Sequence, residues 1–260
     1  MKIYYLGTCS GTEPMVGMHH TSLAIECGDG LYLFDAGENC AHTAYTTGID
    51  LMKMRVIFIS HPHIDHIGGL PNLFACLRKI IYRYKLKLYA DNSLRVFFPR
   101  RGLLESIKTV ALGGYDGKFG FDLIENEMHE GTLYEDGNVR VSAVHNRHFV
   151  EEEGQGWLSY SFLIEAEGKK VVFSGDVKEP SELDALLSGG CDLLIHETGH
   201  HAVGDVCDYA AKMGAKALRF THHGRAIIEN RPKEESFVRE FAERSGISTL
   251  ICHDGMTEEI

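Results

Sequence analysis

The sequence of 260 residues predicts an α/β fold, a four-layer αββα sandwich with two mixed β-sheets packed face to face and helices outside. Two observations lead to this prediction. Apolar, β-branched and aromatic runs of strand length recur in both halves of the chain, and helical stretches return after them. We find no linker, internal repeat or low-complexity tract, so we expect a single domain over residues 1–260.

The first half predicts a β-hairpin followed by a β-α-β unit. Gly28-Asp29-Gly30 has the residues of a tight hairpin turn. The run Arg55-Val-Ile-Phe-Ile-Ser60 is bounded by Ser-His-Pro, so it indicates a buried strand that ends in a loop. The expected elements are strands over 2–6, 21–27, 30–34, 55–60 and 86–90, and helices over 38–48 and 71–84.

The second half predicts a second series of strands with helices between them. The strands are expected over 139–145, 158–165, 170–174, 192–196, 216–221 and 247–252, and the helices over 180–188, 202–213 and 234–245. Because each half of the chain has its own strands with helices between them, the sequence favours two packed sheets over a single sheet.

The strongest chemical signal follows the strand over 55–60. The stretch His61-Pro-His63-Ile-Asp65-His66 places three imidazoles and one carboxylate within six residues. Imidazole and carboxylate are the usual protein ligands of zinc and other divalent transition metals. A single His is more often a surface or core residue, but grouped imidazoles and a carboxylate need partners when buried. The cluster therefore predicts a metal site, and four donors suggest two ions.

Four other apolar runs end in further donors. They are Leu31-Tyr-Leu-Phe-Asp35, Val139-Arg-Val-Ser-Ala-Val-His145-Asn-Arg-His148, Val171-Val-Phe-Ser-Gly175-Asp176 and Leu218-Arg-Phe-Thr-His222-His223. Together with the cluster at 61–66, these segments resemble the five motifs of the metallo-β-lactamase-fold hydrolases, in the family's order. The resemblance runs from Met1 to Ile260.

The resemblance implies a dinuclear metal centre. It assigns one ion to His61, His63 and His148, the other to Asp65, His66 and His222, and the bridging position to Asp176. His145 competes with His148, and His223 with His222; we prefer His148 and His222 from their places in the motifs. Asp35 is expected to support an imidazole from behind as a hydrogen-bond acceptor. His196, after an apolar strand, is expected to lie beside the site without binding metal.

Within that superfamily the chain resembles ribonuclease Z and its phosphodiesterase relatives. The segments that carry this resemblance are Lys2-Ile-Tyr-Tyr-Leu-Gly-Thr, Asp192-Leu-Leu-Ile-His196-Glu197-Thr198, Gly199-His200 and Ile251-Cys-His-Asp254-Gly-Met. The resemblance makes His200 a candidate general acid, although Gly199-His200-His201 also resembles a polar helix cap. Two departures disfavour tRNA: no Gly/Pro-rich insertion lies between the second and third motifs, and the segment 149–157 is long and acidic.

Charge is distributed unevenly. The chain has 26 basic and 37 acidic residues, a net charge of −11. Residues 78–108 hold nine basic and two acidic side chains. Such a segment either binds a phosphate or nucleic-acid backbone, or forms a solvated helix face and a lysine-protected sheet edge, which we favour. The acidic remainder argues against a broad nucleic-acid surface.

We therefore expect a metal-dependent hydrolase, most plausibly a phosphodiesterase, in which a metal-bridging hydroxide attacks phosphorus and Asp65 and His200 assist. The cofactors are two divalent ions, zinc first, with manganese or iron as alternatives. Lactone, ester or thioester hydrolysis is the second reading, and a non-catalytic metal-binding or sensing protein is the third. The substrate is expected to be a phosphodiester or another small molecule.

No apolar run is long enough to span a bilayer, and the seven scattered cysteines include no C-x-x-C pair. We expect a cytoplasmic protein that does not associate with membranes, and the sequence is compatible with a homodimer.

Overall fold

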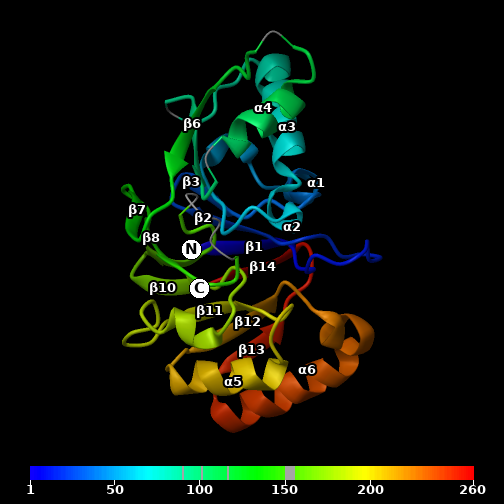
Figure 1. The fold of residues 1–260 in the computed structure, drawn as a ribbon, viewed down its shortest axis with the longest axis vertical. Coiled ribbons are helices and arrows are strands. Elements are labelled where there is room, and N and C mark those ends of the chain that lie inside the picture. Colours follow the sequence, from blue (N-terminus) through cyan, green and yellow to red (C-terminus); the bar gives the residue numbers. More distant parts are fainter. Residues whose placement is uncertain (90, 101, 116, 150–155) are drawn as a thin grey trace. The chain divides into compact units, whose positions relative to one another are not determined.

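The computed structural model describes residues 1–89, 91–100, 102–115, 117–149 and 156–260. They divide into two compact units, which are described one at a time. Unit 1 comprises Met1–Gly7, Pro14–Met128 and Asp254–Ile260, and unit 2 comprises Thr8–Glu13 and His129–His253. Each unit has one seven-stranded mixed sheet with its own helices (Figure 1).

The sheet of unit 1 has the strand order β14-β1-β2-β3-β4-β5-β6. Its first three pairings are antiparallel, and the three from β3 to β6 are parallel. The strands are β1 (Lys2–Gly7), β2 (Ser22–Cys27), β3 (Gly30–Phe34), β4 (Met54–Phe58), β5 (Ser93–Phe98), β6 (Asp122–Glu127) and β14 (Met256–Glu259). Every residue of β3 is buried, as expected of a strand that is covered on both faces.

The helices of unit 1 are α1 (Cys40–Thr46), α2 (Ile64–Ile67), α3 (Leu70–Tyr84) and α4 (Leu103–Leu112), and a 3₁₀ turn covers Leu51–Lys53. The longest, α3, begins with Pro71 in its first turn and ends at Lys85 in the left-handed region. It buries Leu70, Leu73, Phe74, Leu77 and Ile81, a stripe at helical spacing that packs into the hydrophobic core of the unit.

The sheet of unit 2 has the strand order β13-β12-β11-β10-β9-β8-β7. The pairings from β7 to β10 are antiparallel, and those from β10 to β13 are parallel. The strands are β7 (Gly131–Glu135), β8 (Arg140–His145), β9 (Tyr160–Ala166), β10 (Lys169–Phe173), β11 (Leu193–Glu197), β12 (Ala217–Thr221) and β13 (Ser248–Ile251).

Two helices, α5 (Val203–Lys212) and α6 (Arg225–Ser245), pack with the parallel strands of unit 2 (Figure 1). Val206 and Cys207 of α5 and Val238 and Phe241 of α6 are buried in one core with β10, β11 and β12. The sequence predicted that the last helix covers residues 234–245. In the structure this helix, α6, begins earlier, at Arg225, and bends at Asn230, two residues before Pro232.

Two predicted elements are wrong. Residues 86–89 form no strand, and Ala90 lies outside the described residues. Tyr89 and Asn92 have positive φ angles of 42° and 54°, so the chain turns here, and the strand follows as β5. The predicted helix over 180–188 is one 3₁₀ turn, Pro180–Leu183, closed by the capping box of Glu179 and Glu182. The sequence reading also missed α4, β6 and β7.

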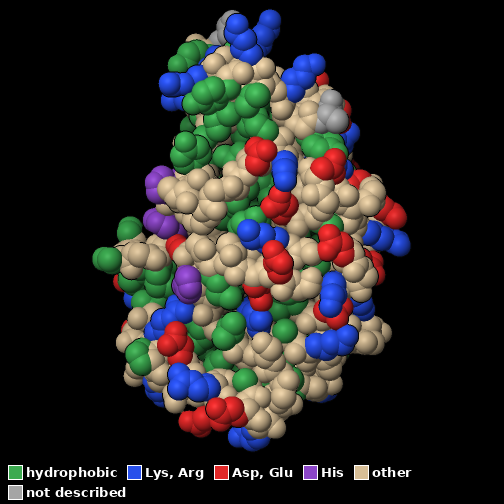
Figure 2. Space-filling model, turned by 180° about the vertical axis from the view of Figure 1, so that it is seen from behind, with side chains coloured by type: hydrophobic (Ala, Val, Ile, Leu, Met, Phe, Trp, Pro, Cys, Tyr) green, Lys and Arg blue, Asp and Glu red, His purple; other side chains and the backbone are tan. Residues whose placement is uncertain are grey.

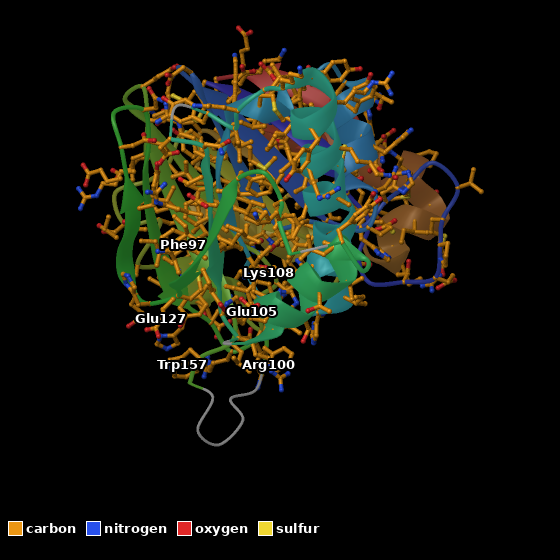
Figure 3. All side chains as sticks on the ribbon, turned by 90° about the horizontal axis from the view of Figure 1, so that it is seen from above. Phe97, Arg100, Glu105, Lys108, Glu127 and Trp157 are labelled. Carbon is orange, nitrogen blue, oxygen red and sulfur yellow. The ribbon has the colours of Figure 1, made fainter. Side chains whose placement is uncertain are left out.

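Three of the basic side chains of 78–108, those of Arg78, Arg95 and Lys108, have local partners. Arg78 stacks on the rings of Tyr82 and Tyr115, at 4.8 and 4.0 Å from the ring centroids. Lys108 Nζ donates to Glu105 Oε1 at 2.5 Å (Figure 3), and Arg95 lies 3.4 Å from Asp91. Arg101 lies outside the described residues. On the face drawn in Figure 2, Lys and Arg side chains are interspersed with Asp and Glu over much of the surface. These contacts favour the solvated-face interpretation.

Among the described residues, we find no helix with the length and hydrophobicity needed to cross a membrane.

Candidate functional site

In unit 1, the parallel strands β3 and β4 end side by side in polar residues. Asp35 follows β3, and Ser60 and His61 come two and three residues after the end of β4. Asp35 N donates to Phe58 O at 2.9 Å, which extends the pairing of the two strands by one step. Polar residues at the carboxyl ends of neighbouring parallel strands are typical of α/β active sites.

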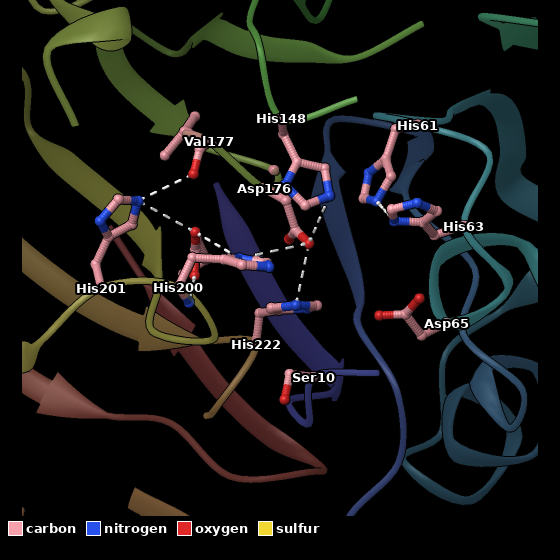
Figure 4. Close-up of polar contacts among 12 residues, drawn as sticks. Ser10, His61, His63, Asp65, His148, Asp176, Val177, His200, His201 and His222 are labelled. Carbon is pink, nitrogen blue, oxygen red and sulfur yellow. Dashed lines mark hydrogen bonds and ion pairs between the residues drawn. The ribbon is translucent and has the colours of Figure 1, made fainter. Parts of the chain in front are cut away.

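The four residues predicted from the motif at 61–66 form one donor set in unit 1. His61 Nε2 lies 2.9 Å from His63 Nδ1 (Figure 4). His66 Nε2 lies 3.3 Å from Asp65 Oδ2. The rings of His61 and His66 are 4.0 Å apart. His63 precedes α2, and Asp65 and His66 lie on that single helical turn, which directs the side chains of a short loop toward one another.

Asp35 holds this set from behind. Its carboxylate accepts hydrogen bonds from Ser60 N at 2.7 Å and Ser60 Oγ at 2.8 Å, and it lies 2.8 Å from His66 Nδ1. The carboxylate and both partners are fully buried. Because Asp35 contacts Nδ1, Nε2 is the nitrogen of His66 that could coordinate a metal ion. Asp35 also adopts φ 58°, unusual for a residue with a side chain and often found at functional sites.

In unit 2, three neighbouring parallel strands end in further donors. Asp176 follows β10, Glu197 ends β11, and His222 follows β12 with φ 48°. The chain between Asn146 and Ser159 adds His148, whose backbone N–H donates to Asn146 Oδ1 at 3.1 Å. Because these strands pair in order, their carboxyl ends lie at one edge of the sheet.

The second donor set surrounds the carboxylate of Asp176. Asp176 Oδ2 lies 3.1 Å from His222 Nε2, 3.6 Å from His148 Nε2 and 3.9 Å from His200 Nδ1 (Figure 4). The side chains of His222 and Asp176 are almost completely buried, whereas that of His200 is 43% exposed. One carboxylate within reach of three imidazoles is a set of groups that binds divalent metal ions.

His145 and His223, the two alternatives to His148 and His222 in the sequence, contact other groups in unit 2. His145 stacks on Trp157 and lies 2.7 Å from Glu130, away from the contacts that Asp176 makes. His223 contacts the backbone carbonyl of Cys252 through Nε2 at 2.8 Å, and burial lowers its pKa to about 3. His223 is therefore a neutral, buried side chain whose hydrogen bond supports β12. These contacts support the preference for His148 and His222.

Glu197 fixes His200. Its carboxylate lies 3.0 Å from His200 Nδ1 and accepts from His200 N at 2.8 Å. Burial acts to raise the pKa of Glu197, but the opposing effects, of which the hydrogen bond from His200 is the largest, outweigh it and hold the pKa below its usual value. His196 is buried against the carbonyl of Glu197, and burial lowers its pKa, so it remains neutral.

Gly199 is a residue whose importance the sequence reading missed. A Cβ here would lie 2.7 Å from His222 Cδ2 and 3.0 Å from His222 Nε2, too close for any side chain. We expect Gly199→Ala to displace the imidazole of His222 and to lower kcat/KM on the order of 100-fold, the typical effect of a 1 Å misplacement. Gly204→Ala is the matched control, because its Cβ would meet only Phe237 at 3.5 Å. Equal kcat/KM values for the two variants would contradict this role.

The donor sets fit divalent metal ions. Two ligand atoms that bind one tetrahedral zinc at about 2.1 Å lie about 3.4 Å apart. The separations within each unit, 2.9 Å from His61 to His63 and 3.1 Å from His222 to Asp176, are close to that value. The sets consist of nitrogen and carboxylate donors, which zinc, manganese and iron accept.

The family model described as Anti-Pycsar protein Apyc1 matches residues 1–244. The chain belongs to that family. The curated relatives include the ribonuclease Z of Methanothermobacter thermautotrophicus, which is 26% identical over 314 aligned positions that cover 100% of this chain and 97% of the relative. The ribonuclease Z of Exiguobacterium sibiricum is 25% identical, with 96% and 97% covered.

The solved structures that are similar to this chain include the following two. YhfI from Bacillus subtilis, a metallo-beta-lactamase fold protein, has a TM-score of 0.74 at 18% identity, and human tRNase Z, short form, has 0.72 at 19%. Each comparison covers 100% of this chain and 99% of the other. The predicted fold class and the resemblance to ribonuclease Z-like proteins are confirmed. The chain is a metal-dependent hydrolase of the metallo-β-lactamase fold.

Proposed function

We propose that this Apyc1-family chain is a dinuclear phosphodiesterase that acts on small phosphodiesters, with residues 1–260 working as one hydrolase domain. The observation that carries the proposal is the carboxylate of Asp176 with three imidazole nitrogens 3.1 to 3.9 Å away. Together with the imidazoles and carboxylate of the 61–66 loop, it supplies enough donors for two ions with open positions.

The ligand assignment that we propose follows the sequence motifs. His61, His63 and His148 would hold one ion, Asp65, His66 and His222 would hold the other, and Asp176 would be a ligand of both. Zinc is the first choice because imidazole nitrogens dominate the set, with manganese and iron as alternatives. Two divalent ions at such a site lower the pKa of a shared water and stabilise charge on the phosphoryl oxygens.

The residues of this chain have separate tasks in the proposed reaction. Asp35 orients His66, and Glu197 orients His200, each through an imidazole Nδ1. With Nδ1 held by Glu197, Nε2 is the nitrogen of His200 that we assign to proton transfer, on a side chain that is 43% exposed. We propose that this nitrogen donates a proton to the leaving oxygen as the ester bond breaks, while Asp65 holds its ion and accepts from the attacking water.

A small substrate is favoured over tRNA by the length of the chain. The alignment with the Methanothermobacter ribonuclease Z spans 314 positions, whereas this chain has 260 residues, so at least 54 positions of that alignment have no residue here. The basic residues Arg78, Arg95 and Lys108 have aromatic, acidic or backbone partners. Both observations favour a compact substrate without a long nucleic-acid contact.

A cytoplasmic location and a homodimer remain part of the proposal. None of the seven cysteines, all of which lie in the described residues, forms a disulfide, which fits a reducing compartment.

The test is hydrolysis by the full chain loaded with zinc or manganese. We expect turnover of bis(p-nitrophenyl) phosphate that disappears on chelation with EDTA and returns when metal is added back. Turnover of a lactone or carboxylic ester with none of any phosphodiester would overturn the phosphodiesterase proposal. Cleavage of a tRNA precursor with a higher kcat/KM than small phosphodiesters would overturn the small-substrate proposal.

A further inference from the structure

The loops that follow β10 and β11 in unit 2 carry Asp176 and His200. Ser174 N donates to Ile195 O at 3.0 Å, directly after the paired stretch of the two strands. Beyond that bond the loop after β11 turns toward β12, where Thr198 N donates to two carbonyl oxygens at 3.2 and 3.3 Å. The position of His200 relative to Asp176 therefore depends on side-chain contacts between the two loops.

His201 contacts both loops through a single nitrogen. Its Nε2 lies 3.0 Å from the carbonyl oxygen of Val177, the residue after Asp176 (Figure 4). The same nitrogen lies 3.4 Å from Glu197 Oε1. Because a carbonyl oxygen only accepts hydrogen bonds, Nε2 carries a proton and donates it to Val177 O. One N–H thus contacts the loop of Asp176 and the carboxylate that holds His200.

The imidazole of His201 is itself held in place. Its side chain is 11% exposed, so few water molecules compete for its hydrogen bond. The buried ring of His196 packs edge-on against it, with ring centroids 5.6 Å apart and an interplanar angle of 73°. Glu197 Oε1, 3.4 Å away, is also 3.0 Å from His200 Nδ1, so both imidazoles share one carboxylate oxygen. In the part of the chain that the structure describes, His201 belongs to no group of donors that could hold a metal ion.

We propose that His201 is a positioning residue for proton transfer by His200; this rests on the proposed function. Its Nε2–H fixes the loop of Asp176 against Glu197, and Glu197 holds Nδ1 of His200, which lies 3.9 Å from Asp176 Oδ2. Without this N–H the two loops move relative to each other, and the proton donor moves away from the leaving oxygen. Residues that orient the groups of a metal site from behind typically contribute about 10- to 100-fold to activity.

The kinetic test uses His201→Phe, which keeps an aromatic ring beside His196 but removes the N–H. On an alkyl phosphodiester we expect kcat to fall about tenfold or more with KM unchanged. On bis(p-nitrophenyl) phosphate the loss should be much smaller, because p-nitrophenolate leaves without a proton. His201→Gln, whose side-chain amide offers an N–H in a similar place, should restore most of the rate.

The matched control is His129→Phe. His129 also contacts a backbone carbonyl, that of Glu130, through Nδ1 at 2.9 Å, but from an exposed position in unit 2. This variant should have the kcat of the wild type on both esters. Wild-type kinetics in His201→Phe, or an equal loss on both esters, overturn the positioning role.

A double mutant shows whether His201 acts through His200. In the His200→Ala protein the proton donor is already absent, so adding His201→Phe should lower kcat on the alkyl phosphodiester no further. Losses that multiply in the double mutant overturn the proposal, because His201 would then act by another route.

A readout that is independent of turnover is the ¹⁵N spectrum of protein labelled at histidine. The signals that disappear in His201→Gln belong to His201. We expect its Nε2 to carry the proton, with and without added zinc, because Val177 O only accepts. A proton on Nδ1 alone overturns the proposal. A wild-type chain that carries the Nε2 proton but hydrolyses no phosphodiester contradicts the proposed function and leaves the contact between the two loops in place.

Discussion

Asp65→Ala and His63→Ala should each lose both bound metal and activity. Each change removes a donor from the set at 61–66, where His61 Nε2 lies 2.9 Å from His63 Nδ1 and Asp65 Oδ2 lies 3.3 Å from His66 Nε2. Metal ions contribute several kcal/mol of transition-state stabilisation, so we expect kcat/KM to fall on the order of 1000-fold or more. Elemental analysis of the purified variants gives metal per chain, and hydrolysis of bis(p-nitrophenyl) phosphate gives the rate.

His42→Ala is the control for this prediction, because His42 is an exposed imidazole at the start of α1 that belongs to neither donor set. It should keep the metal content and rate of the wild type. Asp65→Ala protein that carries a full complement of metal and hydrolyses at the normal rate would rule out our ligand assignment for that residue.

The sequence was most informative where a donor directly follows a buried strand. β3, β10 and β12 end in apolar or small residues, and Asp35, Asp176 and His222 stand within three residues of their ends. Hydrophobic runs identify strands, and a polar residue after such a run has few structural reasons to be there. Since these signals are local, they could be read without knowledge of how the strands pair.

The wrong elements arose where local propensity competed with tertiary contacts. The run at 86–90 is mostly apolar, with a single Lys between two Leu residues, and so resembles a strand. In the structure, Asn92 Oδ1 accepts from Leu88 N at 2.9 Å and the chain turns. Over 180–188 the side chain of Glu182 accepts from the backbone of Lys178 and from Arg147, which fixes a 3₁₀ turn in place of a helix. Arg147 lies 35 residues from Glu182 along the chain, so no local sequence pattern predicts this contact.

The sequence could not predict the close contacts in the candidate site between residues that are far apart along the chain. A Cβ at position 199 would lie 2.7 Å from the ring of His222, so only glycine fits there, and the ring of His145 stacks on that of Trp157. A glycine or a tryptophan can stand in a loop for many structural or functional reasons, which the sequence does not distinguish. The packing of unit 2 shows which contacts Gly199 and Trp157 make.

His200→Ala should keep its metal and lose rate. His200 Nδ1 is 3.0 Å from the carboxylate of Glu197 and 3.9 Å from that of Asp176, so Glu197 is the main partner of its imidazole. His148 and His222 lie closer to Asp176 than His200 does. A positioned general acid contributes about 10²- to 10⁴-fold. The loss should depend on the leaving group, because p-nitrophenolate departs without a proton whereas an alkoxide needs one.

The decisive comparison therefore uses two substrates for one variant. On an alkyl phosphodiester we expect His200→Ala to lose about 10²-fold or more in kcat, and on bis(p-nitrophenyl) phosphate much less. Glu197→Gln, which keeps the shape of the side chain but removes its charge, should show the same leaving-group pattern in weaker form. Loss of metal from His200→Ala would instead make His200 a ligand, and an equal loss of rate on both esters would remove it from proton transfer.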